Sequence, residues 1–211
     1  QEIASYRLDQ LLADPGLRID VHYKVAVEPV YHPHADLTRA HRHEFYTLAV
    51  TGNKESRHMV DFRQIDMPPE SLFLLAPWQI HLPSDTDQAI DVFLISFTPD
   101  FLPAGVPALP VCMEKPVTPG AEDYKEIWHI CSRLLQEFKA GKALQQPVLQ
   151  QYLALLLTLF IRYLPQTDTP GQLQPELLTR YRELMEKHLM SWSSPGEYAR
   201  ALHVTRDHLN D

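Results

Sequence analysis

The sequence has few cysteines, and this excludes a disulfide-rich secreted scaffold. Its 211 residues contain two, Cys112 and Cys131, whereas small secreted domains that depend on disulfides carry them densely. Cys131 falls on the apolar stripe of a predicted helix, so we expect a small buried hydrophobic residue there. The N-terminus has neither the basic segment nor the apolar segment of a secretory signal. We therefore expect a cytoplasmic protein.

The sequence also lacks an apolar run long enough to cross a membrane. The most apolar stretch, residues 152–164, contains Arg162 and is followed by Pro165. A membrane-spanning helix needs roughly 18–20 apolar residues, so no membrane association is expected. An apolar stretch of this length is more typical of a helix in the core or in an interface between subunits.

Positive charge is scarce as well. The 19 Lys and Arg residues are outnumbered by 27 Asp and Glu residues, which gives a formal net charge of −8 at pH 7. We therefore do not expect the whole chain to be a non-specific binder of nucleic acids or other polyanions.

Residues 19–97 have the composition and alternation of short β-strands. The strand-like stretches are residues 19–27, 41–50, 56–62, 71–77 and 88–97. Short strands at this spacing, with turn residues between them, are typical of a β-sandwich or a β-barrel. Gly52-Asn53 predicts a hairpin-like connection between the second and third stretches.

After the proline-rich residues 99–120 the apolar period becomes helical, so the chain is predicted to be α+β. Residues 122–140 carry one apolar stripe and are followed by Gly141, a residue type that often ends helices. A second helix is predicted from Pro147 to Leu164, apolar on nearly all sides. This helix pair is our candidate for a homodimer interface, and packing within the core of one subunit is the alternative.

Residues 197–211 predict a helix-turn-helix. Glu197–Leu202 is expected to form a short helix, followed by a tight connection at His203-Val204. Thr205 can cap a second helix, because its hydroxyl accepts a hydrogen bond from an early backbone N–H. In DNA-binding proteins this second helix enters the major groove. The first helix is expected to bury Tyr198, Ala199 and Leu202.

This tail resembles the first helix-turn-helix of AraC/XylS-type transcription regulators. The resemblance rests on a Tyr-Ala-x-x-Leu helix, a turn and the segment Thr-x-x-His-Leu-Asn, with RYRELMEKHL upstream. The front half resembles the cupin-like sensor domain of the same family, in the segments HRHEFYTLAVTG, Asp61-Phe62, APWQIH and FLISFTPDFL. Together these segments cover nearly the whole chain in the expected order.

The resemblance implies an N-terminal cupin-like β-barrel, a helical dimerisation segment and the start of an all-α helix-turn-helix domain. The implied bounds are residues 1–115 for the effector-binding domain, 121–165 for the dimerisation segment, 166–175 for a linker and 176–211 for the DNA-binding part. It also implies a bacterial homodimer that is not an enzyme and needs no cofactor. Because the family carries two helix-turn-helix motifs and this chain stops in the first, we expect a truncated or partly visible chain.

In the intact protein, the resemblance assigns DNA contacts to Thr205, Arg206, Asp207 and Asn210. Arginine with guanine and asparagine with adenine are favoured pairs, and the alternative is that Arg206 and Asp207 are solvated residues of a first helical turn. Residues 176–211 carry five Lys and Arg against six Asp and Glu, so this stretch has no basic face for phosphates. We therefore expect the chain by itself to bind operator DNA poorly.

His41 and His43 are one residue apart, so a strand would carry both on one face. Together with His81 they fit three ligand positions of metal-binding cupins, and three histidines can hold zinc with an open fourth position. The usual carboxylate is missing, because Thr47 stands at its position and Glu44 points to the opposite face. We therefore assign no metal, while metal binding and a purely structural role for these histidines stay open.

The other interpretation of this stretch is one wall of an effector pocket. Strand parity collects His41, His43, Phe45 and Thr47, together with Ala49, on one face. Trp78 and His81 could contribute from the far side. Small-molecule sites are mostly apolar with a few placed polar groups, and Trp78 is suited to stacking on a sugar, so the effector could be a carbohydrate.

The sequence thus favours a transcription regulator controlled by a small molecule. The ligand would act through the N-terminal residues 1–18 folding over the pocket, or through the geometry of the helical interface. The alternative is a metal-dependent cupin enzyme, such as an isomerase or dioxygenase, which leaves residues 176–211 unexplained.

Overall fold

The structure is a computed structural model in which the chain divides into two compact units. The first unit comprises Gln1–Pro107 and Cys112–Leu164, and the second Ala108–Val111 and Pro165–Asp211. The residues that the structure describes are 3–12, 14–24, 39–83, 91–110, 112–164, 177, 180, 181, 184, 185, 188, 191, 192 and 194–205. The domain boundaries expected from the sequence stay predictions.

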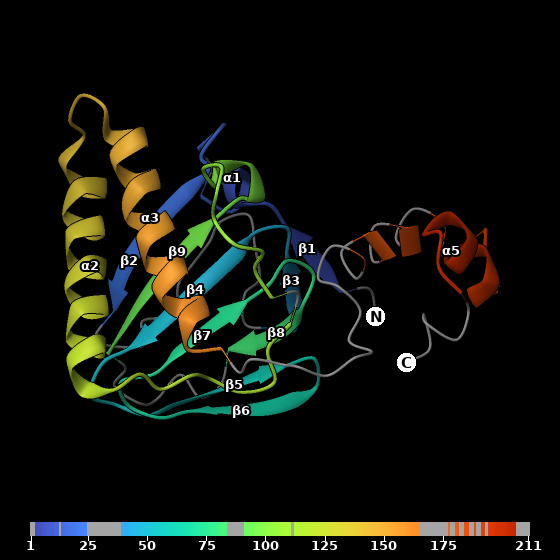
Figure 1. Ribbon diagram of the computed structural model, residues 1–211, viewed down its shortest axis with the longest axis horizontal. Helices are drawn as coiled ribbons and strands as arrows, with labels where there is room; N and C mark the ends of the chain where they lie inside the picture. The colour runs from blue at the N-terminus through green and yellow to red at the C-terminus, as the bar shows by residue number, and fades with distance from the viewer. Residues whose placement is uncertain are drawn as a thin grey trace. The chain divides into compact units, whose positions relative to one another are not determined.

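The first unit contains two β-sheets (Figure 1). The larger sheet has the strand order β1 (Ala4–Tyr6), β3 (His41–His43), β8 (Ile80–Pro83), β5 (Ser56–Val60) and β6 (Arg63–Met67). The smaller sheet has the order β2 (Ile19–Lys24), β9 (Val92–Phe97), β4 (Tyr46–Thr51) and β7 (Leu72–Leu75). β1 pairs with β3 in parallel, and the other pairs among these strands are antiparallel.

The expected closed barrel is not what the described strands form, because they make two separate sheets. The mixed α+β class is confirmed. The reason lies in the stretch 41–50, which was expected to be one strand. It bends at Glu44 and Phe45, so that β3 joins one sheet and β4 the other. Phe45 is buried in a cluster with Leu8 and Leu11, the buried residues of the short helix α1 (Leu8–Leu11).

The expected hairpin at Gly52-Asn53 is wrong for the same reason, since β4 and β5 lie in different sheets. The hairpin that exists joins β5 to β6 through Asp61 and Phe62. Both residues have positive φ, 48° and 64°, as the two central positions of the favoured two-residue hairpin turn require.

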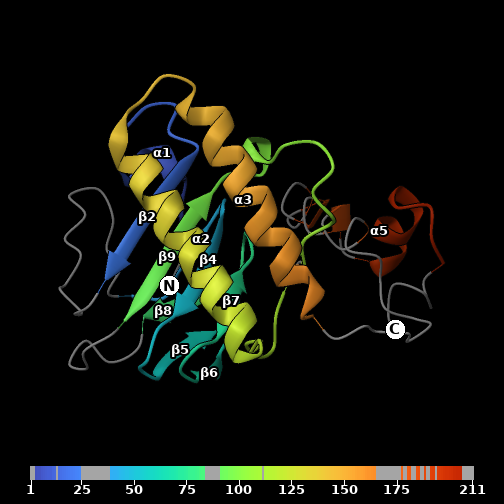
Figure 2. The same ribbon diagram turned by 60° about the vertical axis from the view of Figure 1, so that its left-hand side comes forward.

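One face of the smaller sheet carries the apolar core and packs against helices. α2 (Ala121–Ala140) and α3 (Gln145–Arg162) lie side by side across this sheet (Figures 1 and 2). The Trp128 ring of α2 contacts Phe93 of β9 at 4.6 Å and Tyr23 of β2 at 5.9 Å between ring centroids. Residues directly opposite in antiparallel strands share a face, so Val21 and Ile95, both fully buried, line the same helix-covered side.

The two long helices follow the predicted pattern. α2 buries Tyr124, Ile127, Cys131 and Leu134 of the apolar stripe expected at 122–140, while Trp128, Leu135 and Phe138 of that stripe are half-buried. The helix ends at Gly141, whose φ of 60° is left-handed. Burial raises the pKa of the Cys131 thiol, as expected for an inert core residue. α3 buries Leu149, Leu153, Leu156, Leu157, Leu159 and Phe160. In the part of the chain that the structure describes, no helix is long and apolar enough to span a membrane.

The second unit contains α5 (Pro195–Ala201), close to the helix expected at 197–202. Tyr198, Ala199 and Leu202 are buried, as predicted. Two aromatic rings surround Tyr198, with Trp192 at 5.0 Å and Tyr181 at 5.5 Å between centroids. The expected linker at 166–175 lies outside the described residues.

Candidate functional site

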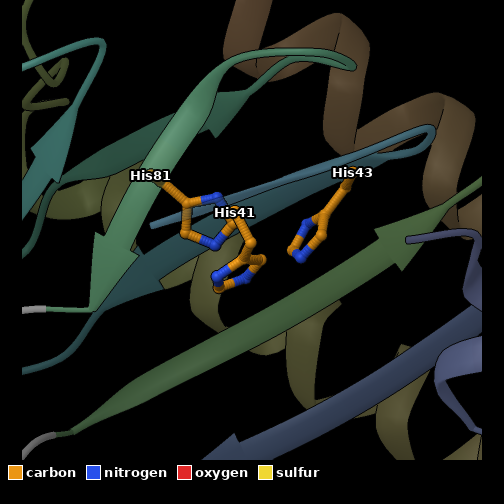
Figure 3. A group of neighbouring side chains, drawn as sticks. All are labelled: His41, His43 and His81. Carbon is orange, nitrogen blue, oxygen red and sulfur yellow. The ribbon is translucent and has the colours of Figure 1, made fainter. Parts of the chain in front are cut away.

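Three histidines converge on one face of the larger sheet (Figure 3). His41 of β3 stands directly opposite His81 of β8 in the antiparallel register, and His43 follows on the same face of β3. The centroid of the His81 ring lies 4.1 Å from that of His41 and 4.5 Å from that of His43. One nitrogen from each ring can be chosen so that all three lie within 4.8 Å of one another.

Aromatic side chains pack around this histidine cluster and fix two of its rings. The Phe45 ring stacks on His43 with a centroid distance of 4.3 Å and an angle of 12°. Tyr6 of β1 meets His41 edge-on at 5.6 Å. His41 and His43 are almost fully buried, with 1% and 8% of their surface exposed. The N-terminal segment therefore lies against the histidine-bearing strand.

The His41 ring has a defined tautomer. Its Nδ1 lies 2.8 Å from the carbonyl oxygen of Arg39. Because a carbonyl oxygen only accepts hydrogen bonds, Nδ1 carries the proton and donates it. The lone pair of the neutral ring is then on Nε2.

A hydrogen-bond network shapes the turn that precedes His81. The Gln79 amide donates to Asp61 Oδ2 at 2.9 Å and accepts from the backbone of Ala76 at 3.0 Å. The other oxygen of Asp61 accepts from Ile80 N at 2.9 Å. These bonds tie the end of β7 and the start of β8 to the β5–β6 hairpin and so place His81 on its strand.

Trp78 lies in the same turn, in a left-handed conformation with φ 73°. Its backbone N–H donates to the His43 carbonyl at 2.7 Å, while its ring lies 5.3 Å from the Arg42 guanidinium carbon. Alternation along β3 sends Arg42 to the face opposite the histidines. The structure therefore brings the Trp78 ring to Arg42 and not to the histidine cluster.

The remaining predicted pocket residues lie in two places. Phe45 packs on His43, as described, but Thr47 belongs to β4 in the other sheet. Thr47 Oγ1 lies 3.0 Å from Ser96 Oγ, on the face of the smaller sheet opposite to the one that the helices cover. Glu44 accepts a 3.5 Å hydrogen bond from Ser5 and is not among the clustered ligand groups.

The surroundings of the cluster disfavour positive charge on its histidine rings. Burial lowers the pKa of His81 well below its ordinary value of 6.5, and the neighbouring rings of His43 and His41 lower it further. Burial also lowers the pKa of His58 on the adjacent strand β5. His81 is therefore neutral at pH 7.

Sequence reasoning missed a row of polar residues on the smaller sheet. Asp20 stands opposite Ser96, and Ser96 stands opposite Thr47, so the three share one face. Asp20 is only 8% exposed, and its Oδ2 lies 2.6 Å from His22 Nε2. Burial lowers the pKa of Lys24 on the same face, with the Asp20 charge opposing this effect. The alternation that places Val21 and Tyr23 on one face also implies a second face with Asp20, and this could have revealed the polar row.

A separate cleft of about 560 Å³ lies near the N-terminus. It is lined by charged residues of both signs, and two ion pairs cross or border it: Arg7 with Asp9 at 2.7 Å and Arg18 with Asp100 at 3.6 Å. None of the three clustered histidines lines it. Four of its charges are thus paired within the chain, and Glu44 accepts a hydrogen bond from Ser5.

The predicted DNA-contacting residues lie at the end of the second unit. Thr205 is exposed and follows the turn after α5. Arg206, Asp207 and Asn210 lie outside the described residues.

Comparison with known proteins leaves the family of this chain open. The chain matches no protein-family profile and no curated protein. Among solved structures it is similar to the crystal structure of the AraC-like transcriptional activator CuxR, with 11% sequence identity and a TM-score of 0.41. The match covers 79% of this chain and 59% of that chain, so this chain spans about three fifths of the length of that structure.

Proposed function

We propose that this chain belongs to a small-molecule-responsive transcription regulator of the AraC/XylS type. A cupin-like sensor domain binds the effector, the helix pair forms a homodimer in the cytoplasm of a bacterium, and the helix-turn-helix unit binds DNA. The chain is a sensor and not an enzyme. The observation that carries the proposal is the capped helix α5 and its turn, which coincide with the most specific sequence resemblance.

The turn after α5 has the geometry that a helix-turn-helix requires. His203 adopts a left-handed conformation with φ 58°. Its N–H donates to Arg200 O at 3.2 Å, and Val204 N–H donates to Ala199 O at 3.0 Å. This pair of bonds is the Schellman motif, which ends a helix and reverses the chain. Thr205 then stands where it can cap a following helix.

The effector site is proposed for the histidine-bearing face of the larger sheet, together with the polar row of the smaller sheet. Its polar groups are held in place by defined contacts, as a specific small-molecule site requires. β1 pairs with β3 and Tyr6 contacts His41, so the N-terminal segment contacts one wall of the site. A ligand that binds better with this segment in one arrangement would shift the population toward it. The case for a carbohydrate rested on Trp78, whose ring lies against Arg42, so the proposed effector is a small molecule of no assigned class.

The dimer is proposed to form through α3. This helix buries its apolar residues within the first unit, yet Leu155 remains 46% exposed. An exposed leucine on an otherwise apolar helix is suited to contact a second copy of the same helix. Leu155→Glu would then convert the dimer to a monomer in analytical ultracentrifugation.

The second candidate is a metal-dependent cupin enzyme, and the convergence of three histidines is the observation that favours it. It gives no role to α5 and its turn. Turnover of a substrate that requires the three histidines, without specific DNA binding, would favour the enzyme.

The regulator is tested by DNA binding of the intact protein. Operator selection from random duplexes is expected to yield one sequence with dyad or direct-repeat half-sites. Arg206→Ala should weaken binding to that sequence by about 10-fold or more, since a good base contact is worth about 1–3 kcal/mol. Arg133→Ala, on the exposed side of α2, is the matched control and should leave binding unchanged. Selection of no preferred sequence would contradict the proposal.

A further inference from the structure

We propose that His41, His43 and His81 bind one divalent transition-metal ion through their imidazole nitrogens. This deepens the proposed sensor site and rests on that function for its biological role, but ion binding itself requires only the first unit. The ion would be a ligand of the sensor in its own right, or would hold an oxygen ligand at its open position.

The backbone already holds the three rings at one place. His41 and His81 are register partners on neighbouring strands, and His43 is two residues further along the same face. Their candidate ligand atoms all lie within 4.8 Å of one another, whereas three nitrogens on a tetrahedral zinc ion lie roughly 3.3 Å apart, given Zn–N bonds of about 2.0–2.1 Å. Small rotations of the rings close this difference without a change in strand register.

The environment of His41 is that of a metal ligand. In metal sites the second ring nitrogen of a ligating histidine commonly donates to a carbonyl or carboxylate oxygen, which fixes the tautomer and orients the ring. His41 makes this bond through Nδ1 to Arg39 O at 2.8 Å. Held in this way, the His41 ring would present Nε2 to an ion.

His81 supplies an independent observation. Its Nδ1 is buried and has no hydrogen bond of ordinary distance and angle, although the Gln79 backbone lies close enough to act on the ring. A buried nitrogen without a partner is uncommon, because burying a polar atom costs free energy unless the atom is paired. An ion between the rings would supply that partner.

The donor set selects the class of ion. Among the described residues, the cluster consists of three imidazoles with no carboxylate or thiolate. Imidazole favours Zn²⁺, Co²⁺, Ni²⁺ and Cu²⁺, whereas Mg²⁺ and Ca²⁺ favour oxygen ligands. Three protein ligands also leave a fourth position open for water or another oxygen donor.

The test is titration of the chelator-treated 211-residue chain with Co²⁺ and with Zn²⁺. Isothermal titration calorimetry should show one ion bound per chain. The Co²⁺ complex should absorb in the visible range with the intensity of a four- or five-coordinate site, and Zn²⁺ should displace it. Mg²⁺ should give no heat of binding at the same concentrations.

Substitutions assign the ligands. His43→Gln and His81→Gln should each weaken Co²⁺ binding by about 100-fold or more, since even the loss of an outer-shell partner costs 10–100-fold. His58→Gln is the matched control, because His58 is a partly buried histidine on the adjacent strand that is not one of the cluster. His129→Gln controls for adventitious binding to an exposed histidine. Neither control should change the affinity.

If a histidine variant fails to fold, X-ray absorption spectroscopy of the unmutated Zn²⁺ complex still identifies the ligands of the ion. The spectrum should show three imidazoles in the first shell. Sub-stoichiometric binding, affinity unchanged in the cluster variants, or fewer than three imidazoles would each overturn the ion site. These outcomes are separate from operator selection, whose failure would overturn the regulator and leave the ion site standing.

Discussion

At the scale of single residues, Gly52 lies directly against the Asp91 carboxylate, which any side chain at this position would have to displace. A Cβ there would overlap the Asp91 carboxylate. That carboxylate accepts hydrogen bonds from Tyr23 Oη at 2.7 Å and from Asn53 N at 3.0 Å. Gly52→Ala would displace it, and we expect the free energy of unfolding, measured by urea denaturation, to fall by about 1–3 kcal/mol.

Gly120 provides the comparison. An added Cβ there would meet its nearest neighbour, Asp123 Oδ2, at 3.9 Å, which is ordinary contact. Gly120 is also the N-cap residue of α2, where serine is well suited. Gly120→Ser should therefore leave stability unchanged or slightly raised. An equal loss in both variants would show that the Asp91 contact is not the cause.

The two histidines with lowered pKa values, His58 and His81, predict how stability depends on pH. Folding lowers the pKa of His58 and of His81 below the ordinary 6.5, so between that value and the folded pKa the unfolded chain binds more protons. Above about pH 6.5 these two groups do not lower the free energy of unfolding. Below that pH, the free energy of unfolding falls by up to about 1.4 kcal/mol per pH unit for each group. Urea denaturation from pH 7.5 to 5 in the presence of a chelator measures this.

His58→Gln removes one of the two groups and should reduce the slope. The exposed His129→Gln serves as control and should retain it. A free energy of unfolding that does not change between pH 7 and pH 5.5 would show that neither buried ring resists protonation.

Single-residue patterns predicted part of the site. The one-residue spacing of His41 and His43 placed both on one face, and the likeness to metal-binding cupins grouped His81 with them. The structure adds that His81 stands directly opposite His41. Trp78 was expected beside the histidines, but its ring lies over Arg42. No sequence pattern reveals that this turn residue has a φ of 73° and that its ring therefore lies there. Asp20 was missed because its neighbours, Ile19 and Val21, dominated the apolar alternation.

At the scale of elements, helices were easier to predict than strand pairing. The stripe of α2 and its stop at Gly141 depend on residues close in sequence, and both were confirmed. The partners of β3, β4 and β5 depend on the bend at Glu44 and Phe45, which packing on Leu8 and Leu11 stabilises. Such a contact joins residues far apart in the chain, so local alternation could not predict the division into two sheets.

The capping box of α5 gives a prediction at this scale. Ser194 Oγ accepts from Gly196 N at 3.1 Å, and Glu197 Oε2 accepts from Ser194 N at 3.1 Å. Ser194→Ala should destabilise α5 by about 0.5–2 kcal/mol. Faster amide hydrogen exchange across residues 196–201 is the measurement.

Ser194→Asp is the matched control, because aspartate caps helices as well as serine does and its charge suits a helix N-terminus. Exchange in this variant should stay near that of the unmutated chain. If Ser194→Ala also exchanges at the unmutated rate, the box does not stabilise α5.

At the scale of the whole molecule, charge sets the affinity for DNA. With a net charge of −8, the 211-residue chain should bind duplex DNA no more tightly than roughly 10⁻⁴–10⁻⁶ M at physiological salt, the range of non-specific binding. Fluorescence anisotropy with a labelled duplex measures this. A nanomolar, sequence-specific complex of this chain alone would contradict the expectation.

The pairing of β1 with β3 has a further consequence for the larger sheet. β1 has three residues, Ala4–Tyr6, and among the described strands it stands at the sheet's edge. So short a strand can detach at a fraction of the free energy of global unfolding. Each detachment would uncover the backbone N–H and C=O groups of β3, and an open edge accepts an extended segment of another molecule. While β1 stays paired, this edge of the sheet offers only a three-residue strand, and very short edge strands limit association of copies edge to edge.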